Sequence, residues 1–164
     1  MEKKQTAILQ LPAGLDSHGQ QVLERLQAGR LDREGYYEIL QSPLFIRNLA
    51  KGDIIAVKPD TPDHFTLIQR SGNLAIRVFR KDDLGALELA LTPEVEKLDG
   101  SLDLQTQRGM SYSLHVNLGF AAIENLFDNM MASFPGTVWY YGNVYDPADG
   151  TSPLNWWDSF INQV

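Results

Sequence analysis

The sequence predicts an α+β protein in which a small β-rich, barrel-like N-terminal part packs on a ferredoxin-like βαββαβ unit with an antiparallel sheet. Short β-prone runs separated by turn signals fill residues 1–72, which is typical of a small barrel or a rolled sheet. The order strand, helix, strand, strand, helix, strand follows in residues 73–146. Residues 147–164 form an aromatic tail that we expect to pack on the body, so that the parts make one compact unit.

Strands are expected in the first part at residues 6–12, 35–43 and 53–60, each of which ends at or near a proline. Residues 20–27 suit either a short helix or a strand, because their apolar residues fit both periods. The short elements on both sides favour a strand.

Two β-prone runs flank Ser-Gly-Asn at residues 71–73, and this pattern predicts an antiparallel hairpin with Gly72 in its turn. Arg70 lies before the turn and Arg77 lies after it. Two interpretations are open for these arginines. In one they are solvated or paired, for example with Asp103, and in the other they clamp a ligand.

Two helical regions are predicted in the second part. After Asp82 or Asp83, either of which can cap a helix, leucines recur at helical spacing. Thr92 and Pro93 then resemble the start of a further helix, because threonine caps helices and proline is tolerated in the first turn. Residues 119–134 give the clearest helical pattern. The residues that define it are Phe120, Ile123, Phe127, Met130 and Phe134.

Alternation in the later strands predicts one sheet face toward the helices and one open, polar face. Those strands are expected at residues 101–107, 110–118 and 137–145. Asp103 and His115 fall on the polar face, and we expect aromatic residues of the last strand, Trp139 and Tyr141, to join them there.

Charge is distributed unevenly along the chain, whose formal net charge is −7. No lysine or arginine follows Arg108, whereas acidic and aromatic residues continue beyond it. Such a surface repels phosphate backbones, which argues against nucleic-acid binding, and it attracts a basic protein. The candidate partner-binding residues are Asp103, His115, Trp139, Tyr141, Asp146, Asp149, Trp157 and Asp158.

Residue types that carry well-known chemistry are scarce. The sequence has no cysteine, which excludes disulfides and thiolate ligands, and it has no phosphate-loop, dinucleotide-binding or nucleophile-elbow motif. Its three histidines, His18, His64 and His115, lack metal-ligand spacing. We therefore expect no metal, no cofactor and no catalytic residues. The sequence shows no signal peptide and no run of about 20 apolar residues, so we expect a cytoplasmic location without membrane contact.

The segments at residues 35–59 and 65–79 contain an aromatic strand, a proline–aromatic turn, a Gly-Asp strand start and an Arg-Ser-Gly step before an Arg-Val strand. The residues that carry this pattern are Tyr36, Pro43, Phe45, Gly52, Asp53, Arg70, Ser71, Gly72, Arg77 and Val78. The pattern resembles a bacterial family known as domain of unknown function 4265. The likeness spans residues 8–145, leaves the Trp-Trp tail outside and implies no activity.

Together these observations predict a bacterial, non-enzymatic protein-binding module, such as an immunity protein that neutralises a basic toxin. One alternative is a small-molecule-sensing domain that uses the open sheet face. Another is an enzyme that uses His115 and Asp103 as an acid–base pair. The sequence does not indicate an oligomeric state.

Overall fold

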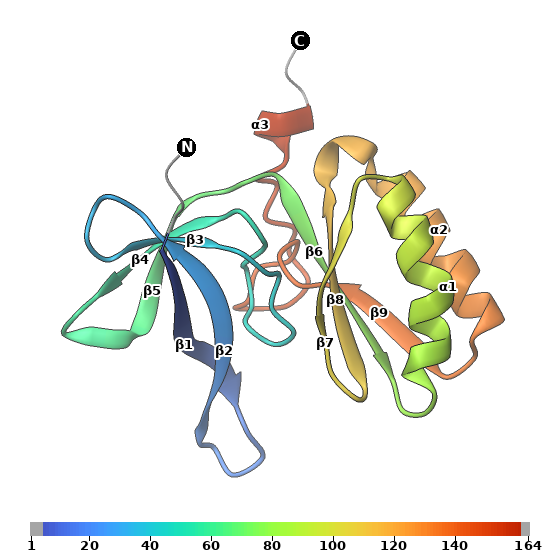
Figure 1. Cartoon of the computed structure of the whole chain (residues 1–164), viewed down its shortest axis with the longest axis horizontal. Helices are drawn as coiled ribbons and strands as arrows, with labels where there is room; N and C mark the ends of the chain where they lie inside the picture. The colour runs from blue at the N-terminus through green and yellow to red at the C-terminus, as the bar shows by residue number, and fades with distance from the viewer. Residues whose placement is uncertain (1–4, 162–164) are drawn as a thin grey trace.

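The computed structural model describes residues 5–161, which form two antiparallel sheets and three α-helices. Figure 1 shows the layers: the N-terminal sheet lies on one side of the C-terminal sheet, and α1 (Leu84–Lys97) and α2 (Phe120–Ser133) lie on the other. The short α3 (Asp158–Ile161) lies beside the segment that joins the two sheets. The predicted α+β class is confirmed.

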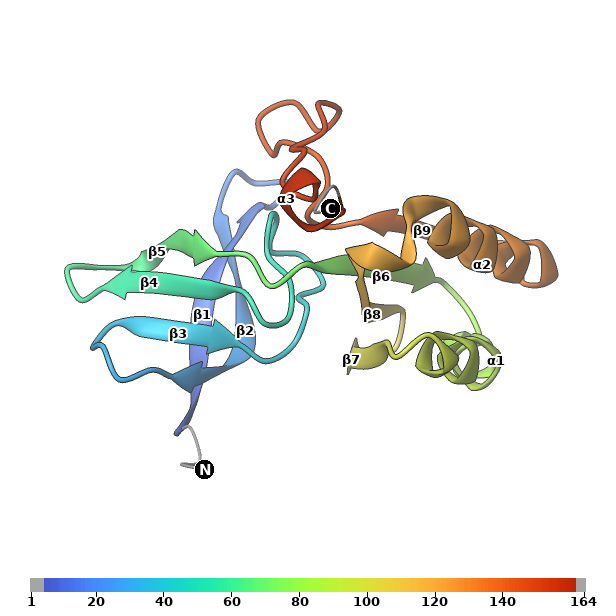
Figure 2. The same cartoon turned by 90° about the horizontal axis from the view of Figure 1, so that it is seen from above.

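The N-terminal sheet is an antiparallel meander with the strand order β1-β2-β3-β4-β5. Its strands are β1 (Thr6–Leu15), β2 (Gln21–Arg30), β3 (Tyr36–Ile39), β4 (Ile54–Lys58) and β5 (Thr61–Gln69). Buried Leu11, Leu26, Ile39 and Ile55 form its core. Residues 20–27 thus lie almost wholly in a strand. The ladder runs from β1 to β5 without closing, so the expected barrel is an open, curved sheet in the described part of the chain (Figure 2).

The C-terminal sheet has the order β7-β8-β6-β9, and all neighbouring strands are antiparallel. Its strands are β6 (Asn73–Arg80), β7 (Ser101–Gln105), β8 (Gly109–His115) and β9 (Thr137–Tyr141). A 3-10 helix (Val116–Leu118) follows β8. Apolar residues of β6 and β8 pack against both long helices, whose inner faces carry Leu87, Leu91, Ile123 and Phe127.

The predicted hairpin around Gly72 is wrong. The run before the glycine is β5 of the N-terminal sheet, and the run after it is β6 of the C-terminal sheet. Gly72 does have the positive φ of +96° that a tight bend requires, but the bend passes the chain from one sheet to the other. A local turn signal cannot distinguish these outcomes, since both need the same backbone conformation.

A single helix, α1, replaces the two expected between residues 83 and 97, and it runs through Pro93. Proline has no N–H, so Pro93 leaves the carbonyl of Leu89 without its helical donor. Both residues are exposed, on the solvent side of the helix. Thr92 does not cap a helix; its hydroxyl lies 2.7 Å from the phenol oxygen of Tyr112. Asp83 holds the N-cap position with φ +58°, but its side chain makes no capping hydrogen bond.

The sheet face opposite the helices is not open around β6 and β8. Arg77 on β6 and Ser111 and Ser113 on β8 are buried there, and residues 41–51 cover them. A bulge at Asp103 also turns Leu104 away from the helices and toward the N-terminal core, although alternation alone places it with Leu102. A sensing site on this face is therefore confined to the part that residues 41–51 leave uncovered.

We expect Phe127→Ala to lower the free energy of unfolding by about 3–5 kcal/mol, because Phe127 is fully buried between α2 and the sheet. Urea unfolding followed by circular dichroism measures the change. Leu89→Ala is the matched control, since Leu89 is 77% exposed on α1. Equal effects of the two substitutions would contradict this placement of the core.

Candidate functional site

The two sheets meet at a buried carboxylate, that of Asp53. Its Oδ1 accepts a hydrogen bond from the Ser71 backbone N–H at 2.9 Å, and its Oδ2 accepts one from the Ala50 N–H at 3.0 Å. The Ser71 hydroxyl donates to the Lys51 carbonyl at 2.7 Å. The chain just before β4 is thus fastened to the chain just before β6. We call this cluster, residues 50–53 and 70–73, the junction.

Charge at the junction is held largely out of water. Burial raises the pKa of Asp53, although two backbone N–H groups and the positive charge of Arg70 act in the opposite direction. Burial likewise lowers the pKa of Arg70. The Arg70 guanidinium donates to Asn48 Oδ1 and lies over the Trp156 ring, 5.1 Å from its centroid. Arg70 therefore links the junction to the C-terminal tail.

Two glycines allow the chain segments to approach closely at the junction. A Cβ on Gly72 would lie 2.5 Å from His115 Nε2, and a Cβ on Gly52 would lie 2.7 Å from Ser71 Cβ. Both glycines also have positive φ, +96° and +89°. The junction brings together half of the residues of the family pattern, namely Gly52, Asp53, Arg70, Ser71 and Gly72. Arg77 lies further along β6, under Ile46.

Asp103 lies in a polar cluster between the sheets and not beside His115. Its carboxylate accepts hydrogen bonds from the Ser42 backbone N–H at 2.8 Å, from the Ser101 hydroxyl at 2.6 Å and from the Ser113 hydroxyl. These bonds attach the loop after β3 to β7 and β8, which is a structural role. Asp103 is therefore not a free surface anchor.

His115 is engaged elsewhere. Its Nδ1 accepts a hydrogen bond from the Asn117 backbone N–H at 3.1 Å, and its ring meets Phe160 edge to face, with centroids 6.0 Å apart. The acid–base pair of His115 and Asp103 is therefore not formed, because each side chain has its own separate set of partners.

Trp139 and Tyr141 do not lie on the face opposite the helices, contrary to expectation. Trp139 pairs with Val78 across the β6–β9 ladder, and Val78 faces the helices. On α2, Asp128 accepts a hydrogen bond from Trp139 Nε1 at 2.9 Å, and Glu124 accepts one from the Tyr141 hydroxyl at 3.1 Å. Burial and the Glu124 charge raise the pKa of Tyr141, so its phenol stays a donor.

These aromatic residues begin a continuous row of rings, which we call the aromatic ladder. Its members in order are Phe127, Trp139, Tyr141, Phe120, Trp157, Trp156 and Phe160. Successive ring centroids lie 5.1–5.7 Å apart, which is the usual spacing of favourable aromatic pairs. Apart from Phe127, the members are only partly buried. The ladder therefore presents ring surface to solvent.

The C-terminal tail contacts the body through the ladder. Trp156 Nε1 donates to the Asn143 carbonyl at 2.8 Å, while the Asn143 side chain bridges β6 by accepting from the Ala75 N–H and donating to the Asn73 carbonyl, each at 2.9 Å. Trp157 meets Phe120 at the start of α2. Both tail tryptophans thus bind to elements of the C-terminal sheet unit.

The acidic residues of the tail differ in what their carboxylates do. The Ser152 hydroxyl donates to Asp149 Oδ2, and the Ser152 and Thr151 backbone N–H groups donate to Oδ1 at 2.9 Å. These bonds, with that of the hydroxyl the largest cause, lower the pKa of Asp149 to about 2. Asp146 Oδ1 likewise accepts from the Ala148 N–H at 2.9 Å. Both are turn-forming aspartates. Asp158 is exposed at the start of α3, next to Trp157 in sequence.

Metal binding and membrane crossing by a helix each need a recognisable arrangement of residues. Among residues 5–161, no group of three or more histidine and acidic side chains is arranged to hold a metal ion. In the same part of the chain, no helix has both the length and the apolar character needed to cross a membrane.

Comparison with known proteins places the junction within a family. The family described as Domain of unknown function (DUF4265) matches residues 24–134, which run from β2 to the end of α2. The chain belongs to the DUF4265 family. The matched region includes all of the residues of the family pattern, Arg77 among them, and it excludes β1, β9 and the tryptophan tail.

Among solved structures, a crystal structure of a hypothetical protein from Neisseria gonorrhoeae is similar, with a TM-score of 0.64. The likeness covers 87% of this chain and 96% of that chain at 20% sequence identity, so it concerns the fold alone. No curated protein matches the chain.

Sequence reasoning missed the acidic residues that anchor the ladder. Glu124 and Asp128 stand four residues apart on α2, so they share one face of the helix. The sequence signal for these contacts is the four-residue spacing of the acidic residues on a helix together with the two-residue spacing of Trp139 and Tyr141 on a strand. In the sequence both residues belong to the acidic segment that follows Arg108.

We expect Gly72→Ala to lower the free energy of unfolding by more than about 1 kcal/mol, because the new methyl group meets His115 and the backbone has positive φ. Thermal unfolding measures the change. Gly19→Ala is the control: Gly19 also has positive φ, +75°, but a Cβ there meets nothing within 4 Å. A Gly72→Ala protein no less stable than Gly19→Ala would contradict the close approach.

Proposed function

We propose that the protein is a non-enzymatic binding module that engages a basic protein partner through the aromatic ladder. The observation that carries the proposal is the half-buried row of rings from Trp139 to Phe160, lined by carboxylates in a segment without lysine or arginine. Partly exposed tryptophan and tyrosine side chains are the residues that most often anchor protein interfaces.

Acidic groups accompany the ladder along its length. Asp128 lies at the Trp139 end, Glu124 lies beside Tyr141, and Asp158 follows Trp157. Negative charge of this kind steers a positively charged partner toward the surface and raises the association rate. The hydrogen bonds from Trp139 and Tyr141 also fix the rings before binding, which lowers the entropic cost of association.

The partner class we propose is a basic toxin, with this protein as its immunity protein. A nuclease-type toxin needs a cationic surface to hold phosphates. An acidic, aromatic face can cover such a surface by charge complementarity and by ring burial. The proposal rests on surface character and not on the family, which carries no assigned role.

The absence of catalysis is part of the same proposal. The most plausible acid–base pair in the sequence, His115 and Asp103, is split between two separate clusters. The buried Asp53 is fully engaged by backbone N–H groups that hold the junction. We also assign the C-terminal unit to the ferredoxin-like class within this proposal, because its antiparallel order β7-β8-β6-β9 with two helices on one face is that of a split βαβ fold.

A second candidate function is small-molecule binding in the N-terminal sheet. A cavity of about 590 Å³ opens there between apolar residues of β1, β2 and β4, among them Leu9, Leu23 and Val57. The volume suits a small ligand. A molecule retained by the purified protein, identified by mass spectrometry and lost in Leu23→Lys, would favour this function.

We expect the combined substitution Glu124→Gln, Asp128→Asn and Asp158→Asn to weaken partner binding at least tenfold, mainly by slowing association. The amides keep an oxygen acceptor for Tyr141 and Trp139, so the ladder stays in place while the charge is lost. Affinity capture from the native organism supplies the partner, and surface plasmon resonance at several salt concentrations measures the rates.

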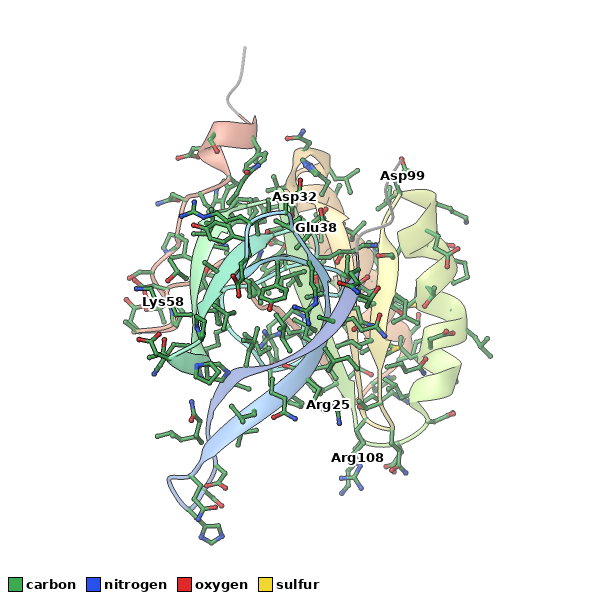
Figure 3. All side chains as sticks on the ribbon, turned by 60° about the vertical axis from the view of Figure 1, so that its left-hand side comes forward. Arg25, Asp32, Glu38, Lys58, Asp99 and Arg108 are labelled. Carbon is green, nitrogen blue, oxygen red and sulfur yellow. The ribbon has the colours of Figure 1, made fainter. Side chains whose placement is uncertain are left out.

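The matched control is the combined substitution Asp32→Asn, Glu34→Gln and Asp60→Asn. It removes the same charge from exposed positions in the N-terminal sheet, where Figure 3 labels Asp32. A captured partner that is acidic, or one that binds both variants equally, would refute the proposed face. Turnover of a small molecule that depends on His115 would refute the non-enzymatic reading.

A further inference from the structure

Arg77 is a buried cation that neither the junction nor the aromatic ladder uses. It lies on β6, on the sheet face away from the helices, and pairs with Tyr140 across the β6–β9 ladder. Only 4% of its surface is exposed. One terminal nitrogen donates to the Ile46 carbonyl, while Nε has no hydrogen-bond partner among the described residues. An unpartnered buried donor is costly, so its retention calls for an acceptor.

A cleft of about 360 Å³ opens beside this guanidinium. Arg47, Tyr140 and Tyr145 line it together with Arg77, and so does Gly142. A Cβ on Gly142 would lie 2.7 Å from Arg77 Nε and 2.9 Å from the guanidinium carbon. Any larger residue at this position would therefore fill the space next to the free donor. Glycine at position 142 therefore leaves the buried guanidinium at the wall of the cleft with no side chain packed against it from this residue.

Both arginines line the same cleft. Burial, the largest cause, lowers the pKa of Arg77, and the Arg47 charge adds to this effect, whereas Tyr140 raises the pKa. Glu24 also raises the pKa of Arg77, but its carboxylate accepts the Leu44, Phe45 and Ile46 backbone N–H groups at 2.7–2.9 Å.

One carboxylate, that of Asp146, also lines the cleft. Its Oδ1 accepts from the Ala148 N–H, so the side chain is held within its own turn. Arg47 Nη1 donates to the Pro147 carbonyl at 3.3 Å, which places Arg47 over the same loop. Apart from the Tyr140 phenol, which also interacts with the Arg77 guanidinium, the acceptors of the two arginines are backbone carbonyls, and Arg77 Nε has none among the described residues.

We propose that this cleft is a binding site for a small organic anion, which presents a carboxylate or phosphate group to Arg77 Nε and to Arg47 while Tyr140 and Tyr145 flank the rest of the molecule. Guanidinium groups suit both kinds of oxyanion because their N–H groups form charge-assisted hydrogen bonds in a fixed plane. The cleft volume lies within the range of small-ligand sites. The two arginines lie on the other side of the sheet from Trp139, because Tyr140 alternates with Trp139 along β9, although Tyr141 of the aromatic ladder also lines the cleft.

Titration of the full chain with inorganic phosphate and, separately, with acetate tests the proposal by two-dimensional ¹H–¹⁵N NMR. The Arg77 Nε–H signal reports directly on the free donor. We expect it to shift downfield and to saturate with at least one anion. Tighter binding of phosphate would indicate a phosphorylated ligand and tighter binding of acetate a carboxylate, and either outcome supports an anion site.

Arg47→Ala is the decisive variant, because Arg47 is exposed and its loss leaves the core intact. We expect it to weaken anion binding about tenfold or more, as for loss of a charge-assisted hydrogen bond. Tyr145→Phe provides a second variant with a smaller expected loss. Arg108→Ala is the charge-matched control, since Arg108 projects from the distant end of the β7–β8 hairpin (Figure 3). No shift of Arg77 Nε–H, or equal weakening by Arg47→Ala and Arg108→Ala, would overturn the proposal.

Discussion

The buried carboxylate of Asp53 is the constraint on which the arrangement of this molecule depends. Two sheets, each with its own core, are joined by a single covalent crossing at Ser71 and Gly72. Asp53 accepts backbone hydrogen bonds from Ala50 in the N-terminal part and from Ser71 at the crossing itself. Losing it would leave buried N–H groups without acceptors, each at a cost of about 1–3 kcal/mol. Burying the charge costs free energy, and the hydrogen bonds that the carboxylate accepts fix the geometry between the sheets.

From the junction the constraint extends to the proposed binding face. Arg70, whose charge is attracted to Asp53, lies over Trp156, and Trp156 lies in the aromatic ladder. Gly72 makes room for His115, against which Phe160 rests. The tail is thus held by contacts with the C-terminal unit and, in addition, by Arg70 and Gly72 of the junction. A partner that binds the aromatic ladder therefore contacts α2, β9 and the tail in their folded arrangement.

The fold could be predicted from the sequence where a periodic pattern was long. The helix over residues 119–134 and the order of elements after residue 73 followed from apolar spacing alone. Gly72 shows the limit of local patterns. Ser-Gly-Asn predicts a bend with positive φ, but the bend leads to another sheet because Ser71 binds the Asp53 carboxylate, which is distant in sequence. Pro93 shows a second limit, because an exposed proline was tolerated inside a helix whose packing outweighs it.

The candidate site was harder to foresee than the fold. Strand alternation separates Trp139 and Tyr141 from Tyr140 but does not say which set faces the helices, since all three are amphipathic. The acidic partners on α2 decide it, and they come from another element. Asp103 was misassigned for a related reason: a polar residue on a sheet face looks exposed until a second layer, here residues 41–51, is known to cover it.

Hydrogen exchange measured peptide by peptide in the wild type, Asp53→Asn and Asp53→Ala tests the central claim that Asp53 ties the sheets and the tail together. The account predicts that Asp53→Ala loses protection in β4, β5 and the tail around Trp156, that Asp53→Asn loses less because it keeps one acceptor oxygen, and that α2 keeps its protection in both. Unchanged protection in the tail of Asp53→Ala would contradict it.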